Sequence, residues 1–261
     1  MYGLKLHEKI IAEGHRGYAA KYPENTLVSF KAAMDVGVDQ IEFDVWLSKD
    51  GVPVIMHDQN AKRTTGVDKL ITDMTLDEIK KLDAGSHFDE KFKGEQVPTL
   101  RETLELITSD PKILLGVEIK GRDVRTADVA IDMLREFDCV DRCWFYTWNC
   151  VVLKHMKTTY GDEIRTMAYP DFTMQDIEQV PEFYDYRDEV GIGNYFLSKA
   201  LCTKIQTQDK KRMRMFCMDT EEDIIDAIEH GASAITANDP AVLVEYLNKH
   251  NMRIDKDNFI V

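Results

Sequence analysis

Apolar runs rich in β-branched residues alternate with segments of helical period along the whole of this 261-residue chain. The alternation indicates parallel strands joined by helical crossovers, since a connection between parallel strands needs a dozen or more residues. Eight strands in a chain of this length predict one (β/α)8 barrel, the TIM barrel, over residues 1–261. The predicted strands are residues 10–14, 40–46, 113–119, 143–147, 164–168, 191–197, 213–218 and 234–236.

The segments between these strands have the pattern of helices that cover a sheet. Residues 26–36 and 221–229 each carry apolar residues on one face, as a helix that packs on a core requires. A glycine follows each of them, Gly37 and Gly231, where a left-handed C-cap is expected. Both segments are therefore predicted to be crossover helices.

One long segment, residues 59–98, interrupts this rhythm after the second strand. It contains a short helical pattern at Leu76, Ile79 and Leu82, followed by a polar, glycine-containing run over residues 86–98. In a barrel, such an insertion would lie over the mouth as a small cap. A solvated excursion without a role is the alternative.

Composition narrows the possible partners. The formal net charge of −14 argues against a nucleic-acid surface, because binding to phosphate backbones depends on clustered Lys and Arg. No segment is long and apolar enough for stable membrane insertion, and the first residues lack the pattern of a signal peptide. The five cysteines show no CxxC spacing, which argues against a disulfide framework. We therefore expect a cytoplasmic protein.

Two carboxylates occupy the inner face of the predicted second strand. The strand period of two sends Ile41, Phe43 and Val45 to one face and Glu42 and Asp44 to the other. Same-face neighbours lie roughly 6.6 Å apart, so both side chains can converge on one cation. Leaving both unpaired inside a barrel would cost several kcal/mol per ion. A positive group is therefore expected between them.

The predicted third strand repeats the arrangement, with Glu118 and Lys120 on one face. Glu118 would supply a third oxygen ligand, and a set of three carboxylates without cysteine favours one divalent cation, Mg²⁺ or Ca²⁺, over zinc. A metal-free network, in which Lys120 and Arg16 neutralise the acids, is the alternative.

Two histidines are expected at the mouth, because barrels present reactive groups where their strands end. His15 follows the first strand, and His57 follows a short apolar run after the second. Such a pair can act as general base and general acid near neutral pH, and Arg16 offers a forked donor for a phosphate oxygen. We interpret the other histidines as packed or surface residues: His7, His87, His155, His230 and His250.

Three polar tetra- and pentapeptides are weak signals when taken alone. Asn25 and Thr26 would cap a helix in any protein, the run 63–66 suits a polar turn, and Asp239 suits the capped start of the last helix.

A series of short motifs runs in order through most of the chain, most densely in its first half. They are His15-Arg16-Gly17, Pro23-Glu24-Asn25-Thr26, Glu42-Phe43-Asp44, Lys49-Asp50-Gly51, Pro53-Val54, His57-Asp58, Arg63-Thr64-Thr65, Val97-Pro98-Thr99-Leu100 and Glu118-Ile119-Lys120. Together these motifs resemble the glycerophosphodiester phosphodiesterase family, in its metal-dependent, bacterial cytoplasmic form.

The resemblance implies a TIM barrel with a small cap after the second strand. It also implies hydrolysis of a small-molecule glycerophosphodiester to sn-glycerol 3-phosphate and an alcohol. The roles that it implies are an acid/base pair of His15 and His57, metal ligation by Glu42, Asp44 and Glu118, and phosphate contacts from Arg16 and Lys120. Which histidine is the acid stays open from the residues, and we favour His57.

The second half departs from the family pattern. Residues 216–219 read Phe-Cys-Met-Asp where many members have Trp-Thr-Val-Asn, and Trp148 stands where a Phe is common. Trp148 and Phe216 keep the aromatic character, so we expect a wall for the glycerol or the leaving group, with a changed head-group preference.

Two other functions compete with this interpretation. A lysophospholipase D-like phosphodiesterase would need an apolar surface at the mouth, and the predicted cap around Phe88 and Phe92 is polar overall. A catalytically silent barrel that serves as a binding module would have lost a site residue, and none of the expected residues is missing.

Overall fold

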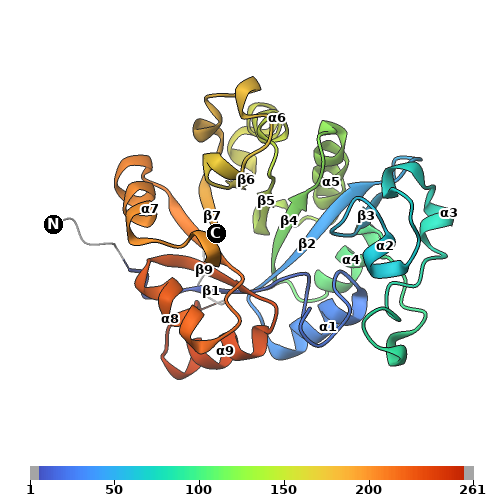
Figure 1. Cartoon of the computed structure of the whole chain (residues 1–261), viewed down its shortest axis with the longest axis horizontal. Coiled ribbons are helices and arrows are strands. Elements are labelled where there is room, and N and C mark those ends of the chain that lie inside the picture. Colours follow the sequence, from blue (N-terminus) through green and yellow to red (C-terminus); the bar gives the residue numbers. More distant parts are fainter. Residues whose placement is uncertain (1–5, 256–261) are drawn as a thin grey trace.

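The computed structural model describes residues 6–255, and within them eight parallel strands form a closed barrel (Figure 1). Closure results because β1 pairs with β2 on one side and with β9 on the other. The predicted TIM barrel is thus confirmed. Its strands are β1 (Ile11–Gly14), β2 (Gln40–Leu47), β4 (Leu114–Ile119), β5 (Cys143–Tyr146), β6 (Arg165–Ala168), β7 (Glu189–Gly193), β8 (Arg212–Phe216) and β9 (Ala232–Ala237).

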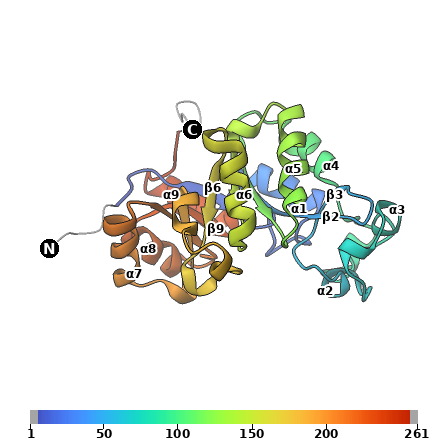
Figure 2. The same cartoon turned by 90° about the horizontal axis from the view of Figure 1, so that it is seen from above.

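Helices surround the strands on the outside of the barrel (Figures 1 and 2). Threonine side chains cap three of them: Thr26, Thr99 and Thr220 each accept a hydrogen bond from a backbone N–H of the first turn. Gly37 ends the first helix in the left-handed conformation, as predicted. The longer helices are α1 (Leu27–Val36), α4 (Leu100–Ile107), α5 (Val124–Glu136), α6 (Cys150–Tyr160), α7 (Lys199–Lys204), α8 (Glu221–Glu229) and α9 (Pro240–Lys249).

The crossover from β6 to β7 differs from the others, because three 3₁₀ helices replace an α-helix: η5 (Asp171–Thr173), η6 (Ile177–Gln179) and η7 (Phe183–Tyr186). The next strand was predicted over residues 191–197, and this position was wrong. β7 ends at Gly193, so residues 194–197 lie beyond it. Residues Asn194–Phe196 form another 3₁₀ turn, and Tyr195 is 93% exposed. The strand instead begins at Glu189, whose charge is neutralised inside the barrel by Arg214.

Alternate residues of β2 point to opposite sides of the barrel wall, as predicted: one set packs against the helices and the other faces the barrel interior. Ile41, Phe43 and Val45 are fully buried in the apolar layer between strands and helices. Phe43 meets Phe30 of α1 there, edge to face, with ring centroids 6.0 Å apart. The intervening residues of the strand are thereby directed into the barrel.

Residues 59–98 form a compact excursion beside the barrel. They follow β3 (Pro53–Ile55), which pairs antiparallel with the end of β2. Their elements are α2 (Lys62–Thr65), η1 (Ile71–Asp73), α3 (Leu76–Ile79) and η2 (Glu90–Phe92). Ile71, Ile79 and Val97 belong to a small apolar cluster of this segment and its neighbours. α2 and α3 stand at the end of the molecule opposite α7 (Figure 2).

Candidate active site

Three carboxylates meet at the mouth of the barrel. Glu42 and Asp44 extend from β2 and Glu118 from β4, and the register pairs Asp44 with Glu118 across the two strands. Each offers one oxygen, and these oxygens lie within 4.8 Å of one another. The three residues are only 4%, 1% and 7% exposed. The inward direction predicted from the strand period is therefore what the fold produces.

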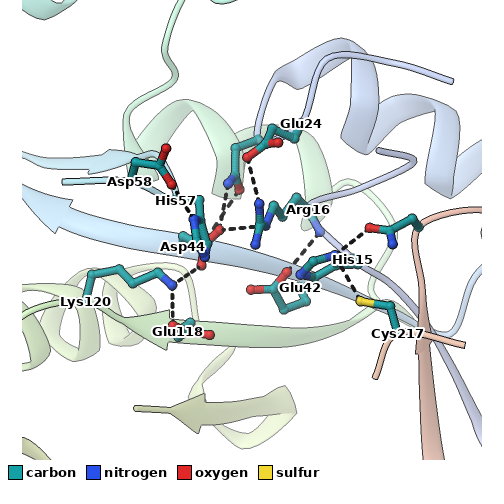
Figure 3. A network of polar contacts seen from close by, with 12 residues as sticks. His15, Arg16, Glu24, Glu42, Asp44, His57, Asp58, Glu118, Lys120 and Cys217 are labelled. Carbon is teal, nitrogen blue, oxygen red and sulfur yellow. Dashed lines mark hydrogen bonds and ion pairs between the residues drawn. The ribbon is translucent and has the colours of Figure 1, made fainter. Parts of the chain in front are cut away.

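Two cations neutralise Asp44. Lys120 Nζ lies 2.9 Å from Asp44 Oδ1 and also contacts Glu118, while Arg16 Nε lies 3.4 Å from Asp44 Oδ2 (Figure 3). Burial opposes ionisation of Asp44, but Lys120, Arg16 and His57 together lower its pKa far below the ordinary value. Asp44 is consequently an anion at any physiological pH.

Glu42 is different, since it has no side-chain ion pair within residues 6–255. Its Oε2 accepts the backbone N–H of Arg16, at 2.9 Å. Burial, with the neighbouring Asp44 and Glu118, raises the pKa of Glu42 well above its ordinary value. A metal-free network of Lys120 and Arg16 therefore leaves one buried carboxylate uncompensated. Three converging carboxyl oxygens, one of them without an ion-pair partner, fit a hard divalent cation, which would favour the ionised form of Glu42.

The two histidines stand on either side of these carboxylates with unlike partners. His15 Nδ1 lies 2.7 Å from Asn238 Oδ1, a neutral amide. Burial and the adjacent Arg16 lower the pKa of His15 to about 4, so its imidazole is neutral at pH 7. His57 Nδ1 lies instead 2.6 Å from the carboxylate Oδ1 of Asp58. Arg63 holds that carboxylate, with Nε 2.6 Å from Asp58 Oδ2.

A chain of ion pairs that was not predicted from the sequence joins the two sides of the mouth. Arg63 Nη1 lies 2.7 Å from Glu24 Oε2, and Arg16 Nη1 lies 2.8 Å from Glu24 Oε1. Asn25 Nδ2 donates to Asp44 Oδ2 at 2.7 Å, so this residue does more than precede a helix cap. The only signal in the sequence was that Glu24, Asn25 and Arg63 fall within two of the ordered motifs.

An aromatic wall closes another side of the site. Trp148 stacks on Tyr169 with ring centroids 3.4 Å apart, and Phe216 meets both rings edge-on. Trp148 and Phe216 were predicted for this wall, whereas Tyr169 was not. The Tyr169 hydroxyl donates to Glu118 Oε2 at 3.2 Å. The wall lines one cavity of about 240 Å³ with two of the carboxylates, Glu42 and Glu118. His15, Arg16 and His57 line it as well.

The floor of this cavity is also charged. Glu13, Tyr146, Arg214 and Thr236 line it from β1, β5, β8 and β9. Tyr146 Oη donates to Glu13 Oε1 at 2.8 Å, and the Thr236 hydroxyl donates to the other Glu13 oxygen. None of the four was predicted, because an isolated charge in a strand gives no indication of its partner before the barrel closes.

The model of the Glycerophosphoryl diester phosphodiesterase family matches residues 15–169. The chain belongs to this family. A glycerophosphodiester phosphodiesterase of Caldanaerobacter subterraneus subsp. tengcongensis is 33% identical over 246 residues, covering 92% of the chain and 99% of that relative. Membership of the family makes the chain a phosphoric diester hydrolase.

Solved structures of the glycerophosphodiester phosphodiesterase family share the fold. A phosphodiesterase from Oleispira antarctica, in complex with the product sn-glycerol-3-phosphate, matches with a TM-score of 0.78 and 26% identity, over 94% of the chain and 97% of that structure. A glycerophosphodiester phosphodiesterase from Agrobacterium tumefaciens matches with a TM-score of 0.72 and 25% identity. The match covers 91% of the chain and 99% of that structure.

Proposed function

We propose that the chain hydrolyses glycerophosphodiesters to sn-glycerol 3-phosphate and an alcohol with the help of one divalent cation, Mg²⁺ or Ca²⁺. The observation that carries this proposal is the cavity of about 240 Å³ in which buried carboxylates, two histidines and Arg16 converge. The product bound to the Oleispira antarctica phosphodiesterase supports the choice of substrate. The substrate is the small-molecule partner.

Glu42, Asp44 and Glu118 would hold the cation. Bound there, it would offset the negative charge on the nonbridging phosphate oxygens as the transition state forms. Arg16 contributes from the protein side. It lines the cavity, so its guanidinium places positive charge beside the phosphate, while its Nε stays 3.4 Å from Asp44 Oδ2. Lys120 forms ion pairs with Asp44 and Glu118 and adds positive charge beside the phosphate.

The unlike partners of the two histidines support a division of roles between them. His15, neutral at pH 7 and facing a neutral amide through Nδ1, accepts the proton of the nucleophile at Nε2. The nucleophile is water, or the glycerol 2-hydroxyl through a cyclic phosphate. The oxygen of the nucleophile bonds to phosphorus as the bond from phosphorus to the alcohol oxygen breaks. On the cyclic route, water then attacks phosphorus and the bond from phosphorus to the glycerol 2-oxygen breaks, which gives sn-glycerol 3-phosphate. His57, whose Nδ1 is held by the Asp58 carboxylate, donates a proton to the departing oxygen.

The surroundings of the cavity support further assignments. We propose that Trp148, Tyr169 and Phe216 position the glycerol or the leaving group, and that residues 59–98 act as a cap beside the entrance. Thr72 of this segment lines a wider groove of about 960 Å³ that also borders His57 and Lys120. The cytoplasm is the proposed location, since all five cysteines are free thiols. Within residues 6–255, no helix has the length and apolar character of a membrane span.

A second candidate function is favoured by one apolar surface. Phe172, Tyr195 and Phe196 are 61%, 93% and 46% exposed. Tyr195 and Phe196 line a cavity of about 340 Å³ that shares Trp148 and Phe216 with the site. The predicted obstacle to a lysophospholipase D-like activity was the lack of an apolar surface near the cap. This surface lies on another side of the mouth, where an acyl chain would fit.

Assays after metal removal test the main proposal. Protein treated with EDTA should lose turnover of glycerophosphocholine and regain it on addition of Mg²⁺ or Ca²⁺, while undiminished activity of the stripped protein would refute the metal site. His15→Ala and His57→Ala should each reduce kcat by roughly 10²–10⁴-fold with metal present. Faster turnover of lysophosphatidylcholine than of glycerophosphocholine would favour the second candidate. Binding without turnover of any diester would indicate a silent binding module.

A further inference from the structure

The imidazole of His15 contacts two side chains on the side that faces away from Glu42. Cys217 lies there, across the imidazole from Glu42, in Figure 3. On this side, His15 Nδ1 is 2.7 Å from Asn238 Oδ1 and 3.3 Å from Cys217 Sγ. Whether Nδ1 carries a proton depends on which of these partners accepts and which donates.

Asp219 determines the orientation of the Asn238 amide. The Asn238 Nδ2 amide donates to Asp219 Oδ2 at 2.7 Å, and the backbone N–H groups of Asn238 and Asp239 donate to Asp219 Oδ1 at 2.6 and 3.2 Å. A carboxylate only accepts hydrogen bonds, so the Asn238 NH₂ group must face Asp219. Its carbonyl oxygen must then face His15.

The Asn238 oxygen in turn requires a proton on His15 Nδ1. An unprotonated Nδ1 would place two lone pairs against each other at 2.7 Å. Cys217 does not compete effectively, because a thiol is a weak donor and its sulfur can accept from the same N–H. Burial, Asp219 and Glu42 raise the pKa of Cys217 to about 12, so no thiolate forms there.

We propose that Asn238, oriented by Asp219, is a positioning residue that holds His15 in the tautomer with Nδ1–H and an unprotonated Nε2. His15 lines the catalytic cavity, and Nε2 is the ring nitrogen left for the reaction. The catalytic meaning of this arrangement rests on the proposed function, in which His15 is the base. The tautomer itself is a property of the resting protein.

Nuclear magnetic resonance of the imidazole nitrogens tests the proposal without any turnover. In protein labelled with ¹⁵N at pH 7, the signals of His15 are identified as those lost in His15→Gln. We expect a protonated, pyrrole-type Nδ1 and a pyridine-type Nε2. The opposite pattern, or a mixture of tautomers, in the wild-type protein would overturn the proposal, whatever the outcome of the activity assays.

Three variants separate positioning from general stability. Asn238→Leu keeps a similar volume without an acceptor, and it should shift His15 towards the Nε2–H tautomer and lower kcat by about 10²-fold or more. Asp219→Asn should likewise shift His15 towards the Nε2–H tautomer, because the backbone N–H groups of Asn238 and Asp239 hold the oxygen of the new amide. Its NH₂ group then faces Asn238, whose own NH₂ group turns towards His15 Nδ1. Cys217→Ala is the matched control, which should keep the wild-type tautomer.

The variants also give the results that would contradict the proposal. An unchanged His15 tautomer in Asn238→Leu, or a changed one in Cys217→Ala, would remove Asn238 from this role. If Asn238→Leu does not fold, as judged by near-ultraviolet circular dichroism, Asp219→Asn alone decides. An Nδ1–H tautomer in a protein that cleaves no diester would support the positioning and refute the proposed function.

Discussion

Arg214→Met is expected to be among the most destabilising substitutions in the barrel interior, because it removes the buried cation that pairs with two buried carboxylates, Glu13 and Glu189. Arg214 is 2% exposed, with Nη1 3.3 Å from Glu189 Oε2 and Nη2 3.5 Å from Glu13 Oε1. Nη2 also donates to Gln40 Oε1 at 2.6 Å. Burial opposes the charge of Arg214, but Tyr146, Glu13 and Glu189 raise its pKa above the ordinary value.

The magnitude follows from the burial of both partners. Removing one member of a buried ion pair costs about 3–5 kcal/mol, since the remaining charge is left in a medium of low dielectric constant. A domain of this kind has a free energy of unfolding of about 5–15 kcal/mol, so the variant should lose a large share of its stability. The guanidinium also lies 5.1 Å from the centre of the Trp144 ring, a contact that Met replaces only in part.

Urea unfolding at pH 7, followed by circular dichroism and checked for reversibility, measures this loss. Arg212→Met is the matched control, since Arg212 lies on the same strand and contacts the same Glu189 at 3.6 Å, but its side chain is 48% exposed. We expect that control to lose at most about 1 kcal/mol. Adding Glu13→Gln and Glu189→Gln to Arg214→Met should restore part of the stability. Equal losses in Arg212→Met and Arg214→Met, or no recovery, would refute the reasoning.

Three further predictions concern the site. Mg²⁺ binding to metal-free protein should release protons and weaken as the pH falls, because the raised pKa of Glu42 makes the proton a competitor of the metal. Calorimetry in two buffers of different ionisation enthalpy measures the proton release, which Glu42→Gln should reduce. Arg63→Met should lower kcat more than it changes KM, because Arg63 holds the Asp58 carboxylate that contacts His57; equal changes in both parameters would contradict this role. Phe216→Ala should raise KM for glycerophosphocholine at least several-fold with a smaller change in kcat, and an unchanged KM would remove Phe216 from the substrate wall.

The sequence alone was sufficient to predict the barrel and the three carboxylates at the centre of the candidate site. The direction of a side chain on a strand follows from a covalent period of two, so Glu42 and Asp44 could be assigned to the interior without knowledge of any neighbour. Glu118 could be added because its strand shows the same alternation. The high cost of unpaired charge inside a barrel then predicted a positive group between them.

The arrangement around that centre was decided only by tertiary structure. Glu13 and Arg214 lie 201 residues apart, and they meet because closure of the barrel places β1 next to β9 and close to β8. The same closure brings Asn238 to His15, across 223 residues. Nothing local distinguishes such residues from surface charges or helix caps. The strand period determines which way a side chain points, whereas only the closed barrel determines what it meets.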